Sequence, residues 1–313
     1  RLMALLSPQN EIVLERVLNL IDRRETAGRP LTQSLIANAI GVSPAVISHF
    51  LKRTYDGDVD KVALLLKSYV EREESKDEGG LLKVPFVPTR PAKAMLDVIK
   101  YSHKYGRMSA VLSGSGTGKT TTIRQAIKDD PSLIVITAWA RLGAIGVQQE
   151  ICDALKMSDG GNSRALMKRL KHKLTDKGRC LIVDDAHTLA FGALDALRYI
   201  YDQTGTGVIL VGIPSLARHL SSKSEEYEQL ASRVAGRVHE LPEFSLDDAR
   251  LMFEAVMGER DVQQAIALLK GDPQTMSSGR RLGNLLEDAG KFASRRGSHM
   301  SLDDLQKALR LAA

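Results

Sequence analysis

The chain has 313 residues, of which 43% are hydrophobic and 26% are charged, and these values predict about two globular domains with a sizeable core. An aromatic content of 4% argues against stacking platforms for single-stranded nucleic acid, and no apolar run approaches the length of a membrane span. The net charge of +6 permits binding to a polyanion without demonstrating it.

The two cysteines, Cys152 and Cys180, are far apart in the sequence and match no metal-binding spacing. We therefore expect them to be reduced core residues of a cytosolic protein. No long apolar segment follows residues 1–6, so no signal peptide is expected.

The first part of the chain predicts a small helical domain. Residues 8–23 carry apolar side chains at helical spacing, and residues 31–51 predict a helix, a tight turn and a second helix. Gly41 falls in the turn, Ser43 is expected to cap the second helix, and Pro44 takes its first position. This pattern is typical of a helix-turn-helix of the repressor type.

The predicted second helix offers a weak set of side chains for reading bases. Its exposed positions are expected to be Ala45, Ser48, His49 and Lys52, whereas base edges favour Arg, Asn and Gln. Lys52 and Arg53 are candidates for contacts to DNA phosphates that carry no sequence information. A three-helix bundle that only docks onto protein therefore stays open as an alternative.

A further amphipathic helix is predicted over about 58–72, and the charged, glycine-ended stretch 71–80 predicts a flexible linker. We expect the chain to divide into an N-terminal helix-turn-helix domain (1–75), a linker (76–90), a nucleotide-binding α/β domain (91–243) and a helical lid subdomain (244–313).

The α/β assignment rests on one loop, residues 113–120, between an apolar strand at 109–112 and the start of a helix. Its glycines let several N–H groups point at one anion, and the new helix adds its positive end. Lys119 is expected to reach the β- and γ-phosphates, and the Thr120 hydroxyl to bind Mg²⁺. The candidate nucleotide-binding residues are Gly114, Ser115, Gly116, Thr117, Gly118, Lys119, Thr120 and Thr121. Ser113 stands where the usual pattern has its first glycine, and we expect Gly114 to take up the turn.

Further apolar runs predict strands at 132–137, 179–183 and 207–212, and a fifth strand is expected at about 237–241. Two acids follow the third strand of the domain: Asp184 is expected to hold Mg²⁺, and Asp185 to polarise the attacking water. Buried strands that alternate with helices predict a parallel sheet covered on both faces. After Pro242 only helices are predicted, near 245–257, 261–270, 279–294 and 301–311.

Together the phosphate loop, the acidic pair, the five strands and the helical lid resemble an AAA+ ATPase. The segment from Gly41 through Phe50, followed by Lys52-Arg53-Thr54-Tyr55-Asp56-Gly57-Asp58, resembles the N-terminal domain of the phage Mu transposition protein B family. This resemblance covers nearly the whole chain. It implies an ATP-dependent, Mg²⁺-requiring protein that binds double-stranded DNA without sequence preference, forms helical filaments on it and activates a transposase in the cytoplasm of a bacterial host.

The resemblance also assigns roles to single residues. Arg233 matches the arginine that is offered to a neighbouring subunit's ATP, with Arg237 as the second choice. Arg281 fits best the lid arginine that contacts phosphates, and Arg280 is its solvated neighbour. Two departures are expected to matter: Asp185 stands where the family usually has Glu, and Ile213 stands where a polar residue senses the γ-phosphate.

The sequence suggests where DNA would bind, but leaves alternatives open. The candidate contacts are Arg141, Arg164, Lys168, Arg169 and Lys171, of which Arg164, Lys168 and Lys171 share one helix face. A solvated helix face is the plain alternative for this cluster. For the whole chain, the competing functions are a helicase- or clamp-loader-type replication ATPase and an ATP-regulated transcriptional regulator.

Overall fold

A computed structural model describes residues 7–26, 30–78, 84–220, 225–258, 261–270, 272–295 and 299–312. By its internal contacts the chain divides into two units, residues 1–83 with 290–299 and residues 84–289 with 300–313. The division around a linker at 76–90 stays a prediction, and residues 79–83 of that linker lie outside the described residues.

The N-terminal part of the first unit has four described helices: α1 (Pro8–Thr26), α2 (Gln33–Ile40), α3 (Pro44–Leu51) and α4 (Val59–Glu78). Each helix contributes one apolar face to a shared core, because its large apolar side chains recur at helical spacing. The most deeply buried members of this core are Val17, Ile36, Ile47, Phe50, Leu66 and Val70.

A tight turn joins α2 to α3. Gly41 adopts a left-handed conformation with φ of 75°, and its N–H donates to the carbonyl of Ala37, which ends α2. Ser43 accepts a hydrogen bond from the amide of Val46 and so caps α3, as expected. The axes of α2 and α3 meet at an angle of 114° across this turn, and the assignment of a helix-turn-helix stays a prediction. Within the described residues no single helix has the length and hydropathy to cross a membrane, and α2 and α3 pass that test only as this bent pair.

Helix α4 is longer than the sequence analysis predicts. It continues through residues 71–78, where a flexible linker is expected, and ends at Glu78. The reason lies in composition, since Glu, Lys and Arg are good helix formers and no glycine precedes Gly79 in this stretch.

The second unit is built on a five-stranded, all-parallel sheet with the order β2-β3-β4-β1-β5. The strands are β1 (Met108–Leu112), β2 (Leu133–Thr137), β3 (Cys180–Asp184), β4 (Gly207–Gly212) and β5 (Val238–Glu240). Helix α5 (Arg90–Tyr105) precedes β1. The helices between the strands are α6 (Lys119–Asp129), α7 (Ala144–Ala154), α8 (Ser163–Leu174), α9 (Phe191–Thr204), α10 (Leu216–Leu220) and α11 (Glu225–Val234), with a short 3-10 turn, η1 (Ala186–Thr188).

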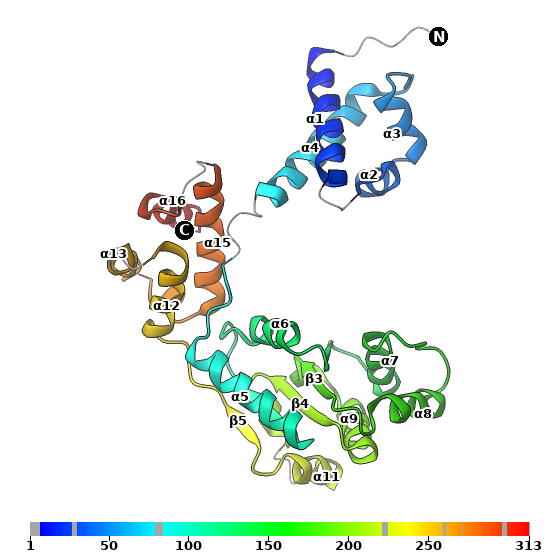
Figure 1. Ribbon diagram of the computed structural model, residues 1–313, viewed down its shortest axis with the longest axis vertical. Helices are drawn as coiled ribbons and strands as arrows, with labels where there is room; N and C mark the ends of the chain where they lie inside the picture. Colours follow the sequence, from blue (N-terminus) through cyan, green and yellow to red (C-terminus); the bar gives the residue numbers. More distant parts are fainter. Residues whose placement is uncertain are drawn as a thin grey trace. The chain divides into compact units, whose positions relative to one another are not determined.

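Both faces of the sheet are covered (Figure 1), because alternate residues of the apolar strands point to opposite sides. Leu112, Ile134 and Val183 pack with α7, α8 and α9 in one core. On the other face, Val111 and Ile209 pack with α5 and α6. The predicted α/β fold with a parallel sheet is therefore confirmed.

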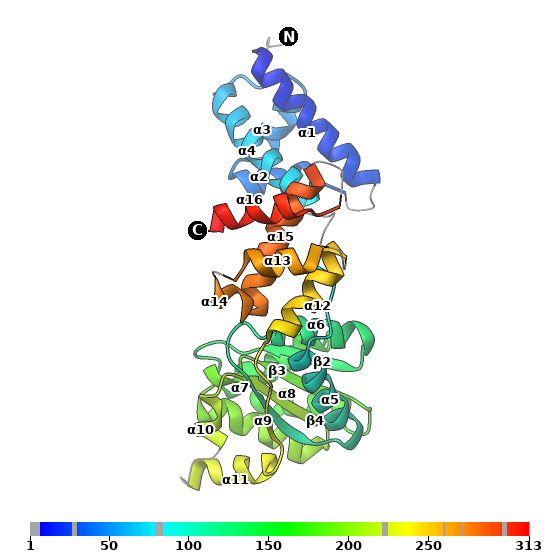
Figure 2. The same cartoon turned by 90° about the vertical axis from the view of Figure 1, so that its left-hand side faces the viewer.

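Among the described residues after β5, the regular elements are all helices, as predicted. They are α12 (Leu246–Met257), α13 (Val262–Leu268), α14 (Pro273–Met276), α15 (Gly279–Arg295) and α16 (Leu302–Ala312). Figure 2 shows them as a group distinct from the sheet, and α13 contacts both α12 and α16. The buried Asp248 links this group to α5, because its carboxylate accepts a hydrogen bond of 2.6 Å from the amide of Arg90.

Candidate functional site

The loop of residues 113–118 leaves β1 and leads directly into α6. Gly116 and Gly118 have φ values of 84° and 92°, a region that favours glycine, whereas Gly114 has no positive φ. Gly114 therefore does not take up the turn in the way that the sequence suggests. Ser113 is instead fixed by its neighbours: its amide donates to the carbonyl of Gly212 at 3.0 Å, and its hydroxyl donates to Thr117 Oγ1 at 2.7 Å.

Lys119 folds back over the loop that it is expected to serve. Its Nζ donates to the carbonyl oxygens of Ser113 and Gly114, at 2.9 and 2.6 Å. Burial lowers the pKa of Lys119 below its usual value, and the nearby carboxylates of Asp184 and Asp185 partly oppose this shift. The lysine thus lies beside both predicted acids and can reach a phosphate held by the loop.

The two predicted magnesium ligands are in direct contact. The Thr120 hydroxyl donates to Asp184 Oδ2 at 2.8 Å, and Asp184 lies at the end of β3 with 3% of its surface exposed. A hydroxyl and a carboxylate suit Mg²⁺, which takes few protein ligands and completes its octahedron with water and phosphate oxygens. Among the described residues no group of three His, Cys, Asp or Glu side chains could hold a metal without such help.

These residues open onto a cleft of about 680 Å³ that runs between the loop and the start of α15. Asp185, in a left-handed conformation with φ of 55°, lines it together with Ile213. The full lining comprises Ser115, Gly116, Gly118, Lys119, Thr120, Thr121, Arg124, Asp185, His187, Ile213, Gly279, Arg280, Gly283, Asn284 and Glu287. Ile213 supplies no polar group here, as its position in the sequence predicts.

The structure separates the two lid arginines. The backbone amide of Arg280 donates to the carbonyl of Gly116 at 3.1 Å, and its Nη1 lies 3.5 Å from Ser115 Oγ. Arg281 instead donates a hydrogen bond to the side-chain carbonyl of Gln274. In this conformation Arg280, the neighbour expected to be solvated, lines the cleft; a phosphate contact by Arg281 stays a prediction.

A second cavity, of about 140 Å³, lies on the other side of the loop and is largely apolar. It is lined by the extended segment before α5, by the first turn of α6 and by lid residues. Its members include Val84, Pro85, Phe86, Val87, Thr121, Thr122, Phe244 and Met252. Such a cavity suits a flat nucleobase. The sequence alone did not predict this cavity, because the run Val84-Pro85-Phe86-Val87, which forms part of its wall, falls in the predicted linker.

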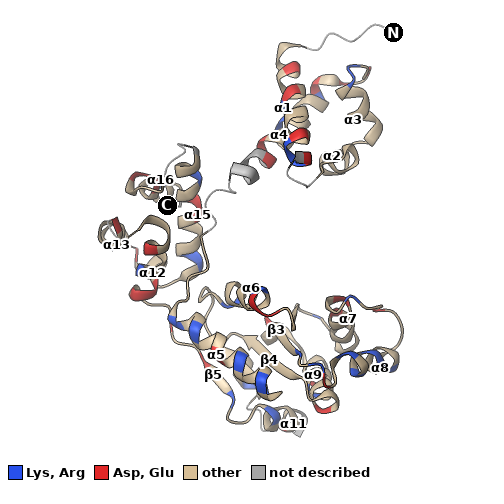
Figure 3. Cartoon of the chain, in the orientation of Figure 1, with Lys and Arg blue, Asp and Glu red and all other residues tan. Residues whose placement is uncertain are grey.

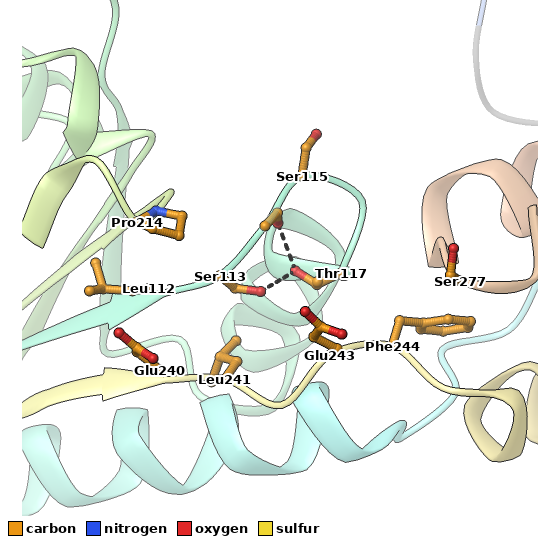
Figure 4. Close-up of a pocket in the computed structure, with 11 residues that line it drawn as sticks. Leu112, Ser113, Ser115, Thr117, Pro214, Glu240, Leu241, Glu243, Phe244 and Ser277 are labelled. Carbon is orange, nitrogen blue, oxygen red and sulfur yellow. Dashed lines mark hydrogen bonds between the residues drawn. The ribbon is translucent and has the colours of Figure 1, made fainter. Parts of the chain in front are cut away.

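A third cavity, of about 430 Å³, borders the outer side of the loop (Figure 4). Ser113 and Thr117 line it from the loop, and Glu240 and Glu243 line it from β5 and the segment after β5. The two carboxylates would repel an anion. Phosphate therefore fits the cleft around Lys119 rather than this cavity.

The candidate trans-acting arginines are held by contacts within the second unit. Arg233, on α11, forms two bonds to the carboxylate of Asp202, at 2.7 Å from Nε and 3.2 Å from Nη2. Arg237 donates to the carbonyls of Met108 and Arg233, at 3.1 and 2.9 Å, so it closes the end of α11. The hydrogen bonds of Arg233 are exposed and 39% of its side chain is accessible to solvent, whereas those of Arg237 are partly buried.

Some of the candidate DNA contacts are exposed, whereas Arg169 is hydrogen-bonded within the chain. Arg164, Lys168 and Lys171 are exposed on α8, which carries many of the basic residues in Figure 3. Arg169 instead turns back and donates to the carbonyl of Gly160. Arg141 is exposed with φ of 77°, in the same loop as the only tryptophan of the chain, Trp139, which is 53% exposed.

The two candidates in the first unit also differ. Lys52 is exposed just after α3. Arg53 has a left-handed backbone with φ of 57° and forms an ion pair of 2.7 Å with Glu11. An exposed lysine is free to approach a phosphate, whereas the arginine would first have to leave its carboxylate.

Comparisons with known proteins agree with this geometry. An AAA domain family matches residues 103–220. The Mu-like prophage FluMu DNA transposition protein B of Haemophilus influenzae is 27% identical over 66% of this chain and 73% of its own length. The ATP-dependent target DNA activator B of Escherichia phage D108 is 25% identical over 93% of this chain and 92% of its own length.

Among solved structures, the ADP form of the Aeropyrum pernix ORC2 protein superposes with a TM-score of 0.53. It is 19% identical and covers 71% of this chain and 67% of that chain, so it supports the fold alone. The chain therefore contains a match to an AAA domain and is similar over most of its length to the transposition B proteins of Mu-like phages.

Proposed function

We propose that this protein is a Mg²⁺-dependent ATPase that binds double-stranded DNA without sequence preference, assembles on it as a filament and activates a transposase. The observation that carries the proposal is the nucleotide site itself. Lys119, Thr120 and Asp184 meet at the carboxyl edge of the sheet, where parallel sheets bind ligands. The names of the relatives, which describe ATP-dependent activators of target DNA, support the second half.

Different parts of the nucleotide are bound by different walls of the site. The loop amides and Lys119 hold the phosphates, while the apolar cavity beside Phe86 and Met252 takes the adenine base. Bound Mg²⁺, held by Thr120 and Asp184, would neutralise charge on the phosphate oxygens. Asp185 orients the attacking water, and the lid contributes Arg281 or, from its position in this structure, Arg280.

Arg233 would couple ATP hydrolysis to the assembly of subunits. On α11 it is bound to Asp202 of its own chain, so it is presented at a surface and not at its own cleft. A guanidinium supplied to a neighbour's ATP stabilises transition-state charge only when subunits stack. A contact of that head-to-tail type produces an open filament if it does not close into a ring.

The DNA-binding surface proposed here is the exposed face of α8, with Arg164, Lys168 and Lys171, supplemented by Arg141. Residues i, i+4 and i+7 lie on one side of a helix, so the three α8 side chains can follow one phosphate strand. Binding through phosphates is insensitive to sequence, which suits a protein that accepts many target sites.

The proposal is tested by fluorescence anisotropy of a labelled random-sequence duplex, titrated with protein at several salt concentrations with ATP, with ADP and without nucleotide. We expect ATP to strengthen binding. Replacing Lys168 and Lys171 with Ala should lower the slope of log K against log salt by about two, because roughly one counterion contact is lost per lysine.

A matched control removes two equally exposed charges from the lid, Arg250 and Lys270. This double variant changes the net charge by the same amount and should keep the wild-type salt slope. Equal effects of the two double variants would refute α8 as the interface. Binding that ATP does not strengthen would refute the proposed function, and electron microscopy of the same mixtures tests the filament directly.

A further inference from the structure

The cleft is also lined by a histidine, His187. His187 lies in the short turn η1 that follows Asp185, and 21% of its side chain is exposed. Its Nδ1 is buried and has no hydrogen-bond partner among the described residues, yet it lies 4.0 Å from Asp185 Oδ1. An unsatisfied buried nitrogen is costly, and such groups gather at functional sites.

The backbone of His187 packs closely against the end of β4. β4 ends at Gly212, and a Cβ added there would lie 3.3 Å from both Cβ and the backbone nitrogen of His187. The absence of a side chain at Gly212 thus lets the η1 turn sit closely against the end of β4. The imidazole is held at the cleft wall, next to the carboxylate that is proposed to orient water.

Among the described residues near Asp185, the cleft has few side chains that could hydrogen-bond to a water or to a phosphate. Asp185 is one methylene shorter than Glu, and Ile213 offers no hydrogen bond at the end of β4. A short carboxylate that must orient a water needs one of its oxygens held, so that the other is aimed. In this turn, the imidazole of His187 is close enough to Asp185 to take that part.

We propose that His187 is a positioning residue for Asp185. In the tautomer with its proton on Nδ1, the imidazole donates to Asp185 Oδ1 after the two groups approach by about 1 Å, a movement within side-chain freedom at an open cleft. The other carboxylate oxygen then faces the attacking water. This inference rests on the proposed ATPase function and assigns to His187 no contact with the nucleotide.

The test separates the two ring nitrogens. In His187→Asn the amide nitrogen takes the place of Nδ1, whereas in His187→Gln it takes the place of Nε2. We expect the Asn variant to keep the wild-type kcat within about threefold, while the Gln and Ala variants lose about tenfold, the scale of a misplaced catalytic group. The Kd for ATP should change less than about twofold in all three, since Asp185 is not a binding residue.

A double-mutant cycle with Asp185→Glu tests the reason for the arrangement. If His187 compensates for a short acid, the loss caused by His187→Ala should shrink to below about threefold in the Asp185→Glu background. The control variant is His239→Ala, because His239 is also half-buried with an unpartnered buried ring nitrogen but lies on β5. It should leave kcat unchanged.

Three results would overturn the inference. These are a wild-type kcat in His187→Ala, equal losses in the Asn and Gln variants, or a loss of ATP affinity that matches the loss of kcat. The last of these indicates a purely structural role. A wild-type protein that hydrolyses no ATP with Mg²⁺ and DNA would overturn the proposed function and this inference together, so the two failures are distinguishable.

Discussion

Replacing Gly116 with Ala should destabilise the second unit, whereas the same change at Gly114 should not. At Gly116 the φ of 84° costs a residue with a Cβ about 1–2 kcal/mol. The new methyl would lie 2.5 Å from Ser278 Oγ, which accepts a weak bond of 3.4 Å from the amide of Arg281, and turning this hydroxyl away costs about 0.5–1 kcal/mol. Ala recovers about 0.4–1 kcal/mol through the unfolded chain, so a net loss of about 1–2 kcal/mol remains.

Gly114→Ala is the matched control in the same loop. Gly114 has no positive φ, and a Cβ placed there meets no atom within 4 Å. Only the unfolded-chain term applies to it, so its stability should be equal to wild type or higher by up to about 1 kcal/mol. Urea unfolding followed by the fluorescence of Trp139 measures both variants, because this single tryptophan reports on the second unit.

The comparison also has a functional readout. Gly116→Ala should weaken ATP binding, because the displaced loop no longer aims its amides at one point. Unfolding midpoints that coincide for the two variants would refute the argument from φ and from the contact to Ser278. A loss at Gly114 larger than at Gly116 would show that the loop turns at the first glycine after all.

Three further outcomes follow from the contacts described above. Arg280→Ala should raise the Kd for ATP more than Arg281→Ala, because Arg280 faces the loop; isothermal titration that ranks them in the opposite order would restore the sequence-based choice. Arg233→Ala should keep ATP binding but lose DNA-stimulated hydrolysis by at least about 10²-fold, and normal turnover would dismiss it as the trans-acting group. Burial raises the pKa of Cys180 to about 12, so at pH 8 almost none of it is thiolate. DTNB should therefore label it at least about 100-fold more slowly than in urea, and rapid labelling of the folded chain would contradict this burial.

The four strands β1 to β4 were predictable because buried parallel strands are largely continuous apolar runs, whereas β5 is a mostly exposed edge strand. Residues 207–212 match β4 at both ends, and the run at 179–183 places Asp184 at the end of β3. The expected pairing of Thr120, at the start of α6, with Asp184, at the end of β3, is present as a hydrogen bond of 2.8 Å. The core of the site was therefore accessible from local patterns alone.

Other features depend on three-dimensional placement that no pattern encodes. Arg280 and Arg281 are about 100° apart around one helix, and only the packing of α15 against Gly116 decides which one faces the loop. The apolar cavity joins segments more than a hundred residues apart, as does the pairing of Arg90 with Asp248. Helix α9 was not predicted, although its Leu194, Leu197 and Ile200 are buried at helical spacing.

The bond between the amide of Arg280 and the carbonyl of Gly116 makes the first turn of α15 an extension of the phosphate loop. α15 has 17 residues, so it is a rod of about 25 Å anchored at one end beside the triphosphate. A tilt of about 5° at that anchor displaces the opposite tip by about 2 Å. If ATP is hydrolysed as proposed, the loss of one phosphoryl group next to this anchor would be felt along the whole helix.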